Sequence, residues 1–163
     1  MLVQSNELFT YNFTKELTMS KNRAFVAFVE NKSDGQKLVL LSKRAKGAKN
    51  SGQWGLPGGK IENGERPIVS IARELAEETG VKISSDILGK NVLDVFTFQR
   101  EGKYRGVIAE VNCEVIIGHT LELTDEVDDY QLLSIEELMS NTFELHYSVK
   151  QYLLLSAHDS DLA

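Results

Sequence analysis

The sequence predicts a single mixed α/β (α+β) domain in which strands and helices alternate. Its 163 residues correspond to one domain, and a chain of this size buries roughly two thirds of its unfolded surface. The composition is typical of a globular protein, with 42% hydrophobic and 26% charged residues and two prolines. β-rich runs alternate with segments in which apolar residues recur every three or four positions, which indicates both strands and helices.

The first half of the domain is expected to begin with two strands and a loop. A β-rich run predicts a strand at Ala24–Glu30, and Asp34-Gly35 is typical of a hairpin turn into a second strand at Lys37–Ser42. The segment Lys43–Gln53 is basic and contains glycine, which favours a loop. Ahead of these elements, residues 1–20 are expected to add an edge strand or a dimer contact.

A longer helix is then predicted from about Glu65 to Thr79. Pro67 fits its first turn, where the missing N–H costs nothing, and Gly80 is a typical C-terminal stop. One face of this helix is apolar, because hydrophobic residues recur at three- and four-residue steps. The positions expected to be buried are Ile68, Ile71, Ala72, Leu75 and Thr79.

The second half is expected to contain two further strands and two helices. Strands at Val92–Gln99 and Tyr104–Ile117 are joined through Glu101-Gly102. Ser134-Ile-Glu-Glu137 is a capping box that opens a short helix, and a final helix covers roughly Phe143–Ser156. The expected bounds are 1–20 for an N-terminal extension, 21–156 for the domain and 157–163 for a frayed tail.

The longer helix also carries acidic residues on a second face. Glu74, Glu77 and Glu78 fall within roughly 100° of one another at 3.6 residues per turn, and Arg73 can pair with Glu77 one turn on. Two glutamates alone are usually a solvated face, but a third carboxylate, an arginine and a glycine-rich entry favour a binding site. Clustered carboxylates bind hard divalent cations, so magnesium or manganese is expected.

The polar and glycine residues between Gly59 and Val81 stand at a fixed spacing that is typical of one family. The matching residues are Gly59, Glu65, Arg73, Glu74, Glu77, Glu78 and Gly80. A chain of this length and composition would show this pattern by chance less than about once in a million cases. The pattern resembles the complete signature of the Nudix hydrolases, which cleave a nucleoside diphosphate linked to another group. The resemblance covers roughly residues 21–155 and implies an α/β/α sandwich with a mixed sheet.

The resemblance implies a metal site and two residues that support it. The expected ligands of Mg²⁺ (or Mn²⁺) are Glu74, Glu77 and Glu78 together with the carbonyl of Gly58, in the turn Trp54-Gly-Leu-Pro-Gly-Gly59. Metal ions held there would neutralise the phosphate oxygens and lower the pKa of a bound water. Two further residues would fix the orientation of the ligands, Glu65 and Arg73. Trp54 is expected in the core rather than stacked on a base.

The proton acceptor for the attacking water has two candidates, Glu74 and Glu126. Glu126 stands six residues before Leu132, where the family frequently has tryptophan ahead of a strand. The alternative for Glu126 is a solvated acidic loop. Its turn-forming, acidic neighbours favour a mobile surface loop, namely Thr124, Asp125, Asp128 and Asp129. Substrate contacts are expected at Gly59, Lys60 and Arg44.

The substrate is left open by the sequence. Trp54–Glu65 is most similar to the mutator-type (MutT) enzymes, which convert nucleoside triphosphates into NMP and pyrophosphate, and this activity ranks first. The ADP-ribose and NADH branches carry prolines that this sequence lacks after Pro67, and the dinucleoside polyphosphate branch favours tyrosine where Phe96 and Phe98 stand. Coenzyme A, through a likeness in Leu40–Gly59, and nucleotide sugars remain alternatives. A non-catalytic nucleotide sensor is a minor one, because all metal-binding glutamates are present.

Charge and the remaining polar residues narrow the function. The net charge of −6 and the pI of about 5.1 argue against a nucleic-acid-binding surface. Cys113, the single cysteine, is expected in the core rather than as a nucleophile. The sequence shows neither a signal peptide nor an apolar run of membrane-spanning length, so a cytoplasmic location is expected. The expected partner is a small-molecule nucleotide, with monomer or homodimer left open. The histidines without metal-ligand spacing are His119, His146 and His158.

Overall fold

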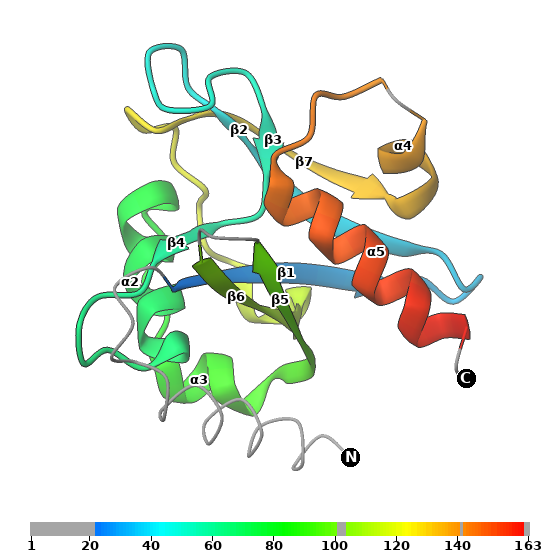
Figure 1. The fold of residues 1–163 in the computed structure, drawn as a ribbon, viewed down its shortest axis with the longest axis horizontal. Coiled ribbons are helices and arrows are strands. Elements are labelled where there is room, and N and C mark those ends of the chain that lie inside the picture. Colours follow the sequence, from blue (N-terminus) through cyan, green and yellow to red (C-terminus); the bar gives the residue numbers. More distant parts are fainter. Residues whose placement is uncertain (1–21, 101–103, 141, 162–163) are drawn as a thin grey trace.

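The computed structural model describes residues 22–100, 104–140 and 142–161 (Figure 1). Its strands are β1 (Arg23–Asn31), β2 (Lys37–Arg44), β3 (Trp54–Gly55), β4 (Gly58–Lys60), β5 (Val92–Arg100), β6 (Tyr104–Asn112) and β7 (Val127–Ser134). Its helices are α2 (Pro67–Thr79), α3 (Ser85–Lys90), α4 (Ile135–Met139) and α5 (Tyr147–Asp161), and a 3-10 helix, η1, covers Cys113–Ile116. The expected extension at residues 1–20 and the turn at Glu101-Gly102 lie outside the described residues.

The strands form one mixed sheet in the order β3-β2-β1-β6-β5, and β4 and β7 add to it by pairing with β1 and β2. β1 and β6 are parallel, whereas the other pairs are antiparallel. Figure 1 shows α2 and α3 on one side of β1 and α5 on the other. The predicted mixed sheet between helices is therefore confirmed. Among the described residues, no helix is long and apolar enough to cross a membrane.

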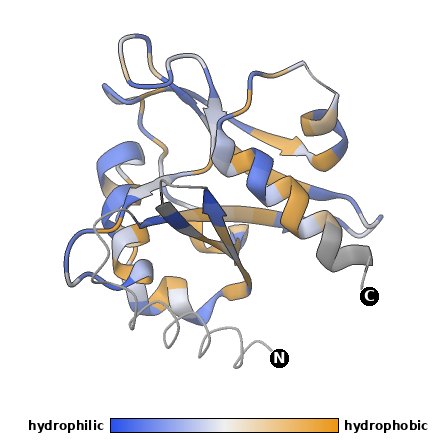
Figure 2. Cartoon of the chain, viewed as in Figure 1, coloured by the Kyte–Doolittle hydropathy of each residue, from blue (hydrophilic) through white to orange (hydrophobic). Residues whose placement is uncertain are grey.

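The central strand β1 contributes to both layers of the core. Successive side chains of a strand point to opposite faces, so Ala24, Val26 and Phe28 pack on the α2 side while Phe25, Ala27 and Val29 pack on the α5 side. All six are at most 3% exposed. Figure 2 accordingly shows the middle of β1 as hydrophobic and its ends as hydrophilic. A strand buried on both faces gives the sheet a rigid centre.

The ends of α2 follow the local signals in the sequence. Pro67 is the first residue of the helix, and Gly80 ends it at a φ of 76°, where its N–H donates to the carbonyl of Ala76. Four of the five positions predicted to be buried are at most 9% exposed, and Ala72 is half-buried. Burial of this face against the sheet fixes the direction of the opposite, acidic face.

Other elements differ from the prediction. α3 was not predicted, although Ser84 caps it by accepting a hydrogen bond from the N–H of Ile87. The strand expected to reach Ile117 ends at Asn112, because the Asn112 side chain accepts the N–H of Glu114 and opens η1. Cys113 consequently lies in η1 and is only partly buried.

The C-terminal helix lies four to five residues later than predicted. α5 begins at Tyr147 because the preceding segment pairs with β3: Trp54 N–H donates to the carbonyl of Glu144 (2.8 Å), and the N–H of His146 donates to the carbonyl of Trp54 (2.8 Å). The helix then continues to Asp161, into the expected tail. Trp54 is 7% exposed and packs against Phe143, which agrees with its expected place in the core.

Candidate functional site

The glycine turn brings β4 against β1 and against the carboxylate of Glu74. Gly58 pairs with Phe25 at a φ of 144°, and a Cβ at this position would overlap the carbonyl of Ala24. A Cβ on Gly59 would stand 2.8 Å from Oε1 of Glu74. Both positions need glycine, Gly58 for its positive φ and for space, Gly59 for space. The turn therefore allows the backbone and the acidic helix face to approach each other.

Arg73 connects the acidic residues on both sides of this turn. Its Nε and Nη2 donate to the two carboxylate oxygens of Glu65, both at 2.9 Å, and Nη2 also donates to the carbonyl of Lys60 at 2.9 Å. Nη1 reaches Glu74 at 3.1 Å and Glu77 at 3.3 Å. The predicted pairing of Arg73 with Glu77 is therefore present. Bidentate contacts of this kind fix the guanidinium plane, and the hydrogen bond from Arg73 lowers the pKa of Glu65.

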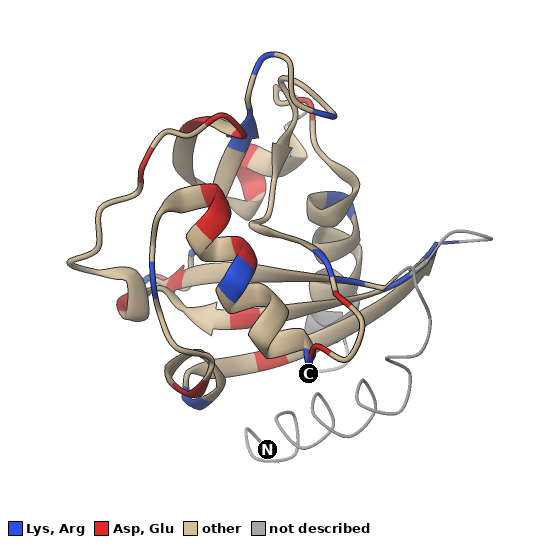
Figure 3. Ribbon diagram, turned by 90° about the vertical axis from the view of Figure 1, so that its left-hand side faces the viewer, with Lys and Arg blue, Asp and Glu red and all other residues tan. Residues whose placement is uncertain are grey.

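The three glutamates that were expected to share one face differ strongly in burial. The Glu77 side chain is 55% exposed, Glu74 is half-buried, and Glu78 is only 2% exposed. Figure 3 shows the acidic part of α2 next to its basic part, and along the sequence all three glutamates follow Arg73. The exposed fractions indicate that Glu78 turns inward beneath the glycine turn, while Glu77 faces solvent.

Glu78 is poorly compensated for a buried carboxylate. Its Oε1 accepts the N–H of Gly58 at 3.1 Å, and Nη1 of Arg44 stands 3.8 Å from its Oε2. Burial and then the nearby charge of Glu74 raise the pKa of Glu78 to about 8. Burial also raises the pKa of Glu74, against the opposing effect of Arg73. The ionised forms of these two neighbouring carboxylates repel each other. A bound cation would reduce this repulsion.

The structure as it stands does not gather these ligands around one point. Among residues 22–100, 104–140 and 142–161, no three Asp, Glu, His or Cys side chains are grouped so that they could hold a metal ion. The contacts of Arg73 give the physical reason, because its guanidinium holds both Glu74 and Glu77. Arg44 likewise reaches Glu78. Positively charged side chains thus stand beside each of these three carboxylates.

Glu126 lies immediately before β7 and is exposed. Its charge contributes to the raised pKa of Glu78, which places it near the buried carboxylate. The expectation of turn-forming neighbours was wrong for Asp128 and Asp129, which are both part of β7. The expected free loop is instead hydrogen-bonded: the hydroxyl of Thr124 donates to the carbonyl of Glu78 at 3.0 Å and accepts the N–H of Glu126 at 3.2 Å.

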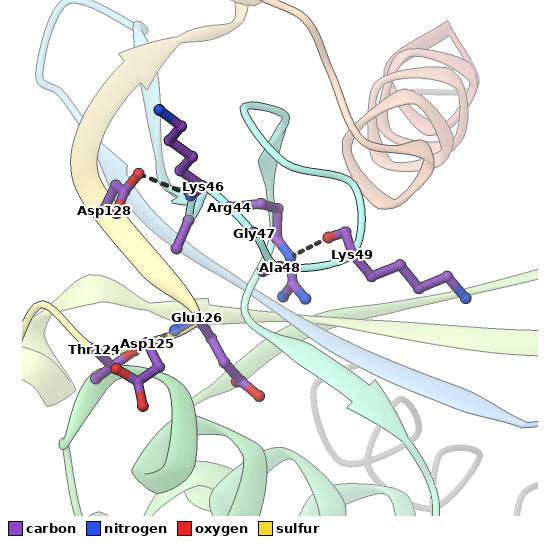
Figure 4. Close-up of a pocket in the computed structure, with 10 residues that line it drawn as sticks. Arg44, Lys46, Gly47, Ala48, Lys49, Thr124, Asp125, Glu126 and Asp128 are labelled. Atoms are coloured by element: carbon purple, nitrogen blue, oxygen red, sulfur yellow. Dashed lines mark hydrogen bonds between the residues drawn. The ribbon is translucent and has the colours of Figure 1, made fainter.

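A pocket of about 690 Å³ opens between residues 44–49 and residues 124–128 (Figure 4). We call residues 43–53 the basic segment. Within it the N–H of Lys46 donates to Oδ2 of Asp128 at 3.1 Å, and Nε of Arg44 donates to the carbonyl of Lys49 at 3.2 Å. Figure 4 shows the side chains of Glu126 and Asp128 pointing apart, with Asp128 toward Lys46. One wall of the pocket is therefore basic and the other acidic.

The predicted substrate contacts are brought together only in part. Arg44 lines the pocket and stands beside Glu78, and Gly59 faces Glu74. Lys60 contributes its carbonyl to Arg73 while the residue itself is exposed. Sequence reasoning missed the contacts of Thr124 and Asp128, since no local pattern links them to partners 46 and 82 residues away.

A neutral histidine lies behind the glycine turn. Nδ1 of His146 accepts the N–H of Ser148 at 3.2 Å, and the Ser148 hydroxyl accepts the N–H of Leu56 at 3.1 Å. Burial, followed by the positive charges of Arg44, Arg100 and Lys49, lowers the pKa of His146 to about 4. His146 thus supports the strand that leads into the turn without adding charge.

The chain is similar in sequence to a known family and to named relatives. A family model described as NUDIX domain matches residues 20–153. The sequence is 35% identical over 63 residues to an 8-oxo-dGTP diphosphatase of Escherichia coli, which covers 39% of this chain and 46% of that protein. It is 29% identical over 117 residues to an ADP-ribose pyrophosphatase of Methanocaldococcus jannaschii, which covers 71% of this chain and 65% of that protein. The matches therefore span less than two thirds of these relatives' lengths.

A solved structure extends the likeness to the fold. The MutT protein from Methanosarcina mazei Go1 superimposes with a TM-score of 0.62 at 20% identity, over 86% of this chain and 94% of that chain. At this identity the likeness concerns the arrangement of sheet and helices. The resemblance that the sequence motif indicated is thus matched independently by a family model and by a fold.

Proposed function

This chain belongs to the Nudix domain family, and we propose that it hydrolyses nucleoside diphosphates linked to another group. The observation that carries the proposal is the buried, poorly compensated Glu78 carboxylate beneath the glycine turn, beside Glu74. Burying an acidic group in this way lowers the stability of the fold, and such groups are common at functional sites. The position of Glu78 within the family motif therefore supports a functional role.

We propose that a divalent cation, Mg²⁺ or Mn²⁺, belongs at this site. The residues fit such a group, because carboxylates whose pKa values are raised by burial and mutual repulsion gain most from a positive charge. The donors would be Glu74, Glu77, Glu78 and the carbonyl of Gly58, and oxygen donors suit a hard cation. When bound, the cation would neutralise the phosphate oxygens and acidify a water molecule.

The residues of the chain itself would then divide the remaining work. Arg73 holds the acidic helix face next to β4, because it binds Glu65 through two hydrogen bonds and also donates to the carbonyl of Lys60. Glu126 or Glu74 would accept the proton of the attacking water, because both carboxylates stand beside Glu78. No covalent intermediate is required, since water attacks phosphorus directly.

The substrate that we rank first is a nucleoside triphosphate, normal or oxidised, converted into NMP and pyrophosphate. In support, the relative named 8-oxo-dGTP diphosphatase is 35% identical over the matched segment. The pocket beside Arg44 and Lys49 presents positive charge to a phosphate chain.

A second candidate substrate is ADP-ribose. In its favour, the alignment with the ADP-ribose pyrophosphatase is the longer one, at 117 residues. Against it, the sequence has no proline after Pro67, where that branch carries its additional mark. Dinucleoside polyphosphates, nucleotide sugars and coenzyme A complete the set of compounds that share the same diphosphate linkage.

The proposal is tested by incubating the protein with these compounds in Mg²⁺ or Mn²⁺ and identifying the products by mass. We expect hydrolysis of at least one compound, complete loss of turnover in excess chelator, and recovery when the cation is restored. Full activity in excess chelator would rule out the metal site. Absence of turnover on every compound, with tight binding of one of them, would instead favour the sensor alternative.

A further inference from the structure

The hydroxyl of Thr124 joins the backbones of two acidic residues that are far apart in sequence. It donates to the carbonyl of Glu78 at 3.0 Å and accepts the N–H of Glu126 at 3.2 Å. The N–H of Thr124 itself donates to the carbonyl of Val127 at 3.1 Å. One side chain therefore connects the C-terminal turn of α2 directly to the residue that precedes β7.

The contact has a physical cause at the end of α2. The last four carbonyls of a helix have no intrahelical partner and must be satisfied from elsewhere. Thr124 satisfies that of Glu78, and the N–H of Glu122 satisfies that of Thr79 at 2.8 Å. The hydroxyl of Tyr130 in turn donates to the carbonyl of Glu122 at 2.5 Å. The segment 122–130 thus caps the C-terminal end of α2.

From this arrangement we propose that Thr124 is a positioning residue that sets the carboxylate of Glu126 relative to Glu78, with Tyr130 as its support. The inference rests on the proposed hydrolytic function, in which Glu126 acts on the attacking water. A proton acceptor must stand within about 3 Å of the atom that carries the proton, and a displacement of about 1 Å can cost on the order of a hundredfold in rate. A segment fixed at Thr124 restricts this displacement.

The test compares Thr124→Val with Thr124→Ser. Valine keeps the shape of threonine without its hydroxyl, so we expect kcat to fall about tenfold with little change in KM. Serine keeps the hydroxyl, so Thr124→Ser should restore kcat to within about twofold of the wild-type value. Tyr130→Phe should lower kcat in the same direction by a smaller factor. Wild-type kcat in Thr124→Val, or equal losses in the valine and serine variants, would contradict the proposal.

A double-mutant cycle with Glu126→Gln separates positioning from general damage to the structure. If Thr124 acts through Glu126, then Thr124→Val should lower kcat by less than about twofold when Glu126 is already glutamine. The same tenfold loss in both backgrounds would show that Thr124 acts independently of Glu126 and would overturn the inference.

Hydrogen exchange supplies a readout that does not depend on turnover. Thr124→Val should raise the exchange rate of the Glu126 amide, because that N–H loses its acceptor. The matched control is Tyr152→Phe, which removes a hydroxyl bonded to Glu110 at 2.7 Å on the α5 side of the sheet. We expect it to leave both kcat and Glu126 exchange unchanged. Unchanged exchange in Thr124→Val would refute the positioning even if no substrate were hydrolysed, whereas faster exchange without turnover would refute only the proposed function.

Discussion

Two glutamates are buried in this fold to nearly the same extent, but their carboxylates have very different hydrogen-bond and ion-pair partners. Glu110 on β6 is 5% exposed, and its carboxylate receives Nζ of Lys37 at 3.2 Å on both oxygens and the hydroxyl of Tyr152 at 2.7 Å. Glu78 on α2 is 2% exposed but receives one backbone N–H, with Arg44 at the longer distance of 3.8 Å.

The difference distinguishes a carboxylate that holds the fold together from one that, under the proposed function, binds a ligand. The positive partner of Glu110 is a side chain of the protein itself, and the contact joins β2, β6 and α5. Glu78 instead has further negative charge nearby, from Glu74 and Glu126, and its positive neighbour Arg44 stands 3.8 Å away. Breaking a buried ion pair costs stability, whereas removing a poorly paired carboxylate relieves repulsion.

The largest expected effect is on turnover. Glu78→Gln and Glu74→Gln keep the side-chain shape and remove the ligand charge, so each should lower kcat by about a hundredfold or more. Folding of the metal-free protein should be unaffected or slightly improved. Rate measurements on both variants and on Glu110→Gln would check this, since Glu110→Gln should keep wild-type turnover. Equal rates in all three variants would contradict a role in turnover that Glu74 and Glu78 have and Glu110 lacks.

The next effect is on stability, and it is expected for Glu110→Gln rather than for Glu78→Gln. Glu110→Gln leaves Lys37 without its charged partner, and we expect a loss of about 1–2 kcal/mol because Lys37 is partly exposed. For a protein of this size that corresponds to a fall in melting temperature of about 5 °C. Thermal unfolding in chelator would show it. A fall as large in Glu78→Gln would mean that Glu78 also stabilises the fold.

A smaller effect is the pH dependence of stability without metal. The pKa of Glu78 is raised from 4.5 to about 8, so the folded state binds this proton more tightly than the unfolded state does. Stability therefore decreases as pH rises through that range. Glutamine mimics the protonated form, so Glu78→Gln should match the wild-type melting temperature near pH 5 and exceed it near pH 8. The other titratable groups, including His146, are the same in both proteins, so their contributions cancel in the difference between the two melting temperatures. A constant difference at all pH values would contradict the assignment.

The smallest effect concerns the acidic wall of the pocket. Asp128→Ala removes the acceptor for the N–H of Lys46 and releases the basic segment, so KM should rise about threefold with kcat nearly constant. Asp129→Ala is the control, because the Asp129 carboxylate accepts the N–H of its own neighbour, Tyr130. Similar KM values in both variants would leave the contact without a functional role.

What the sequence predicted correctly was set by local interactions. Pro67 and Gly80 marked the ends of α2 within two residues, and the spacing of Arg73 and Glu77 predicted their ion pair. The same local logic placed Glu74, Glu77 and Glu78 on one face. It could not show that Glu78 is buried, because its burial depends on the approach of Gly58 from another strand.

Contacts between distant segments could not be predicted from local sequence patterns, because their partners lie elsewhere in the chain. Thr124 reaches a carbonyl 46 residues away, and the start of α5 was shifted by pairing between Trp54 and residues 144–146. α3 was missed although Ser84 carries a capping signal, since six residues give little periodicity to detect. The identities of the candidate site residues were thus predicted from the motif, whereas the arrangement around them required the fold.

The pairing of Trp54 with the segment before α5 also gives the molecule an optical property. Trp54 is the single tryptophan of the 163 residues, it is 7% exposed, and its ring meets that of Phe143 edge-on at 5.9 Å. Its indole fluorescence therefore arises from one defined, shielded position at the junction of the basic segment and α5. Separation of this junction would expose the ring to water and shift its emission to longer wavelength, so the chain carries an intrinsic reporter next to its own pocket.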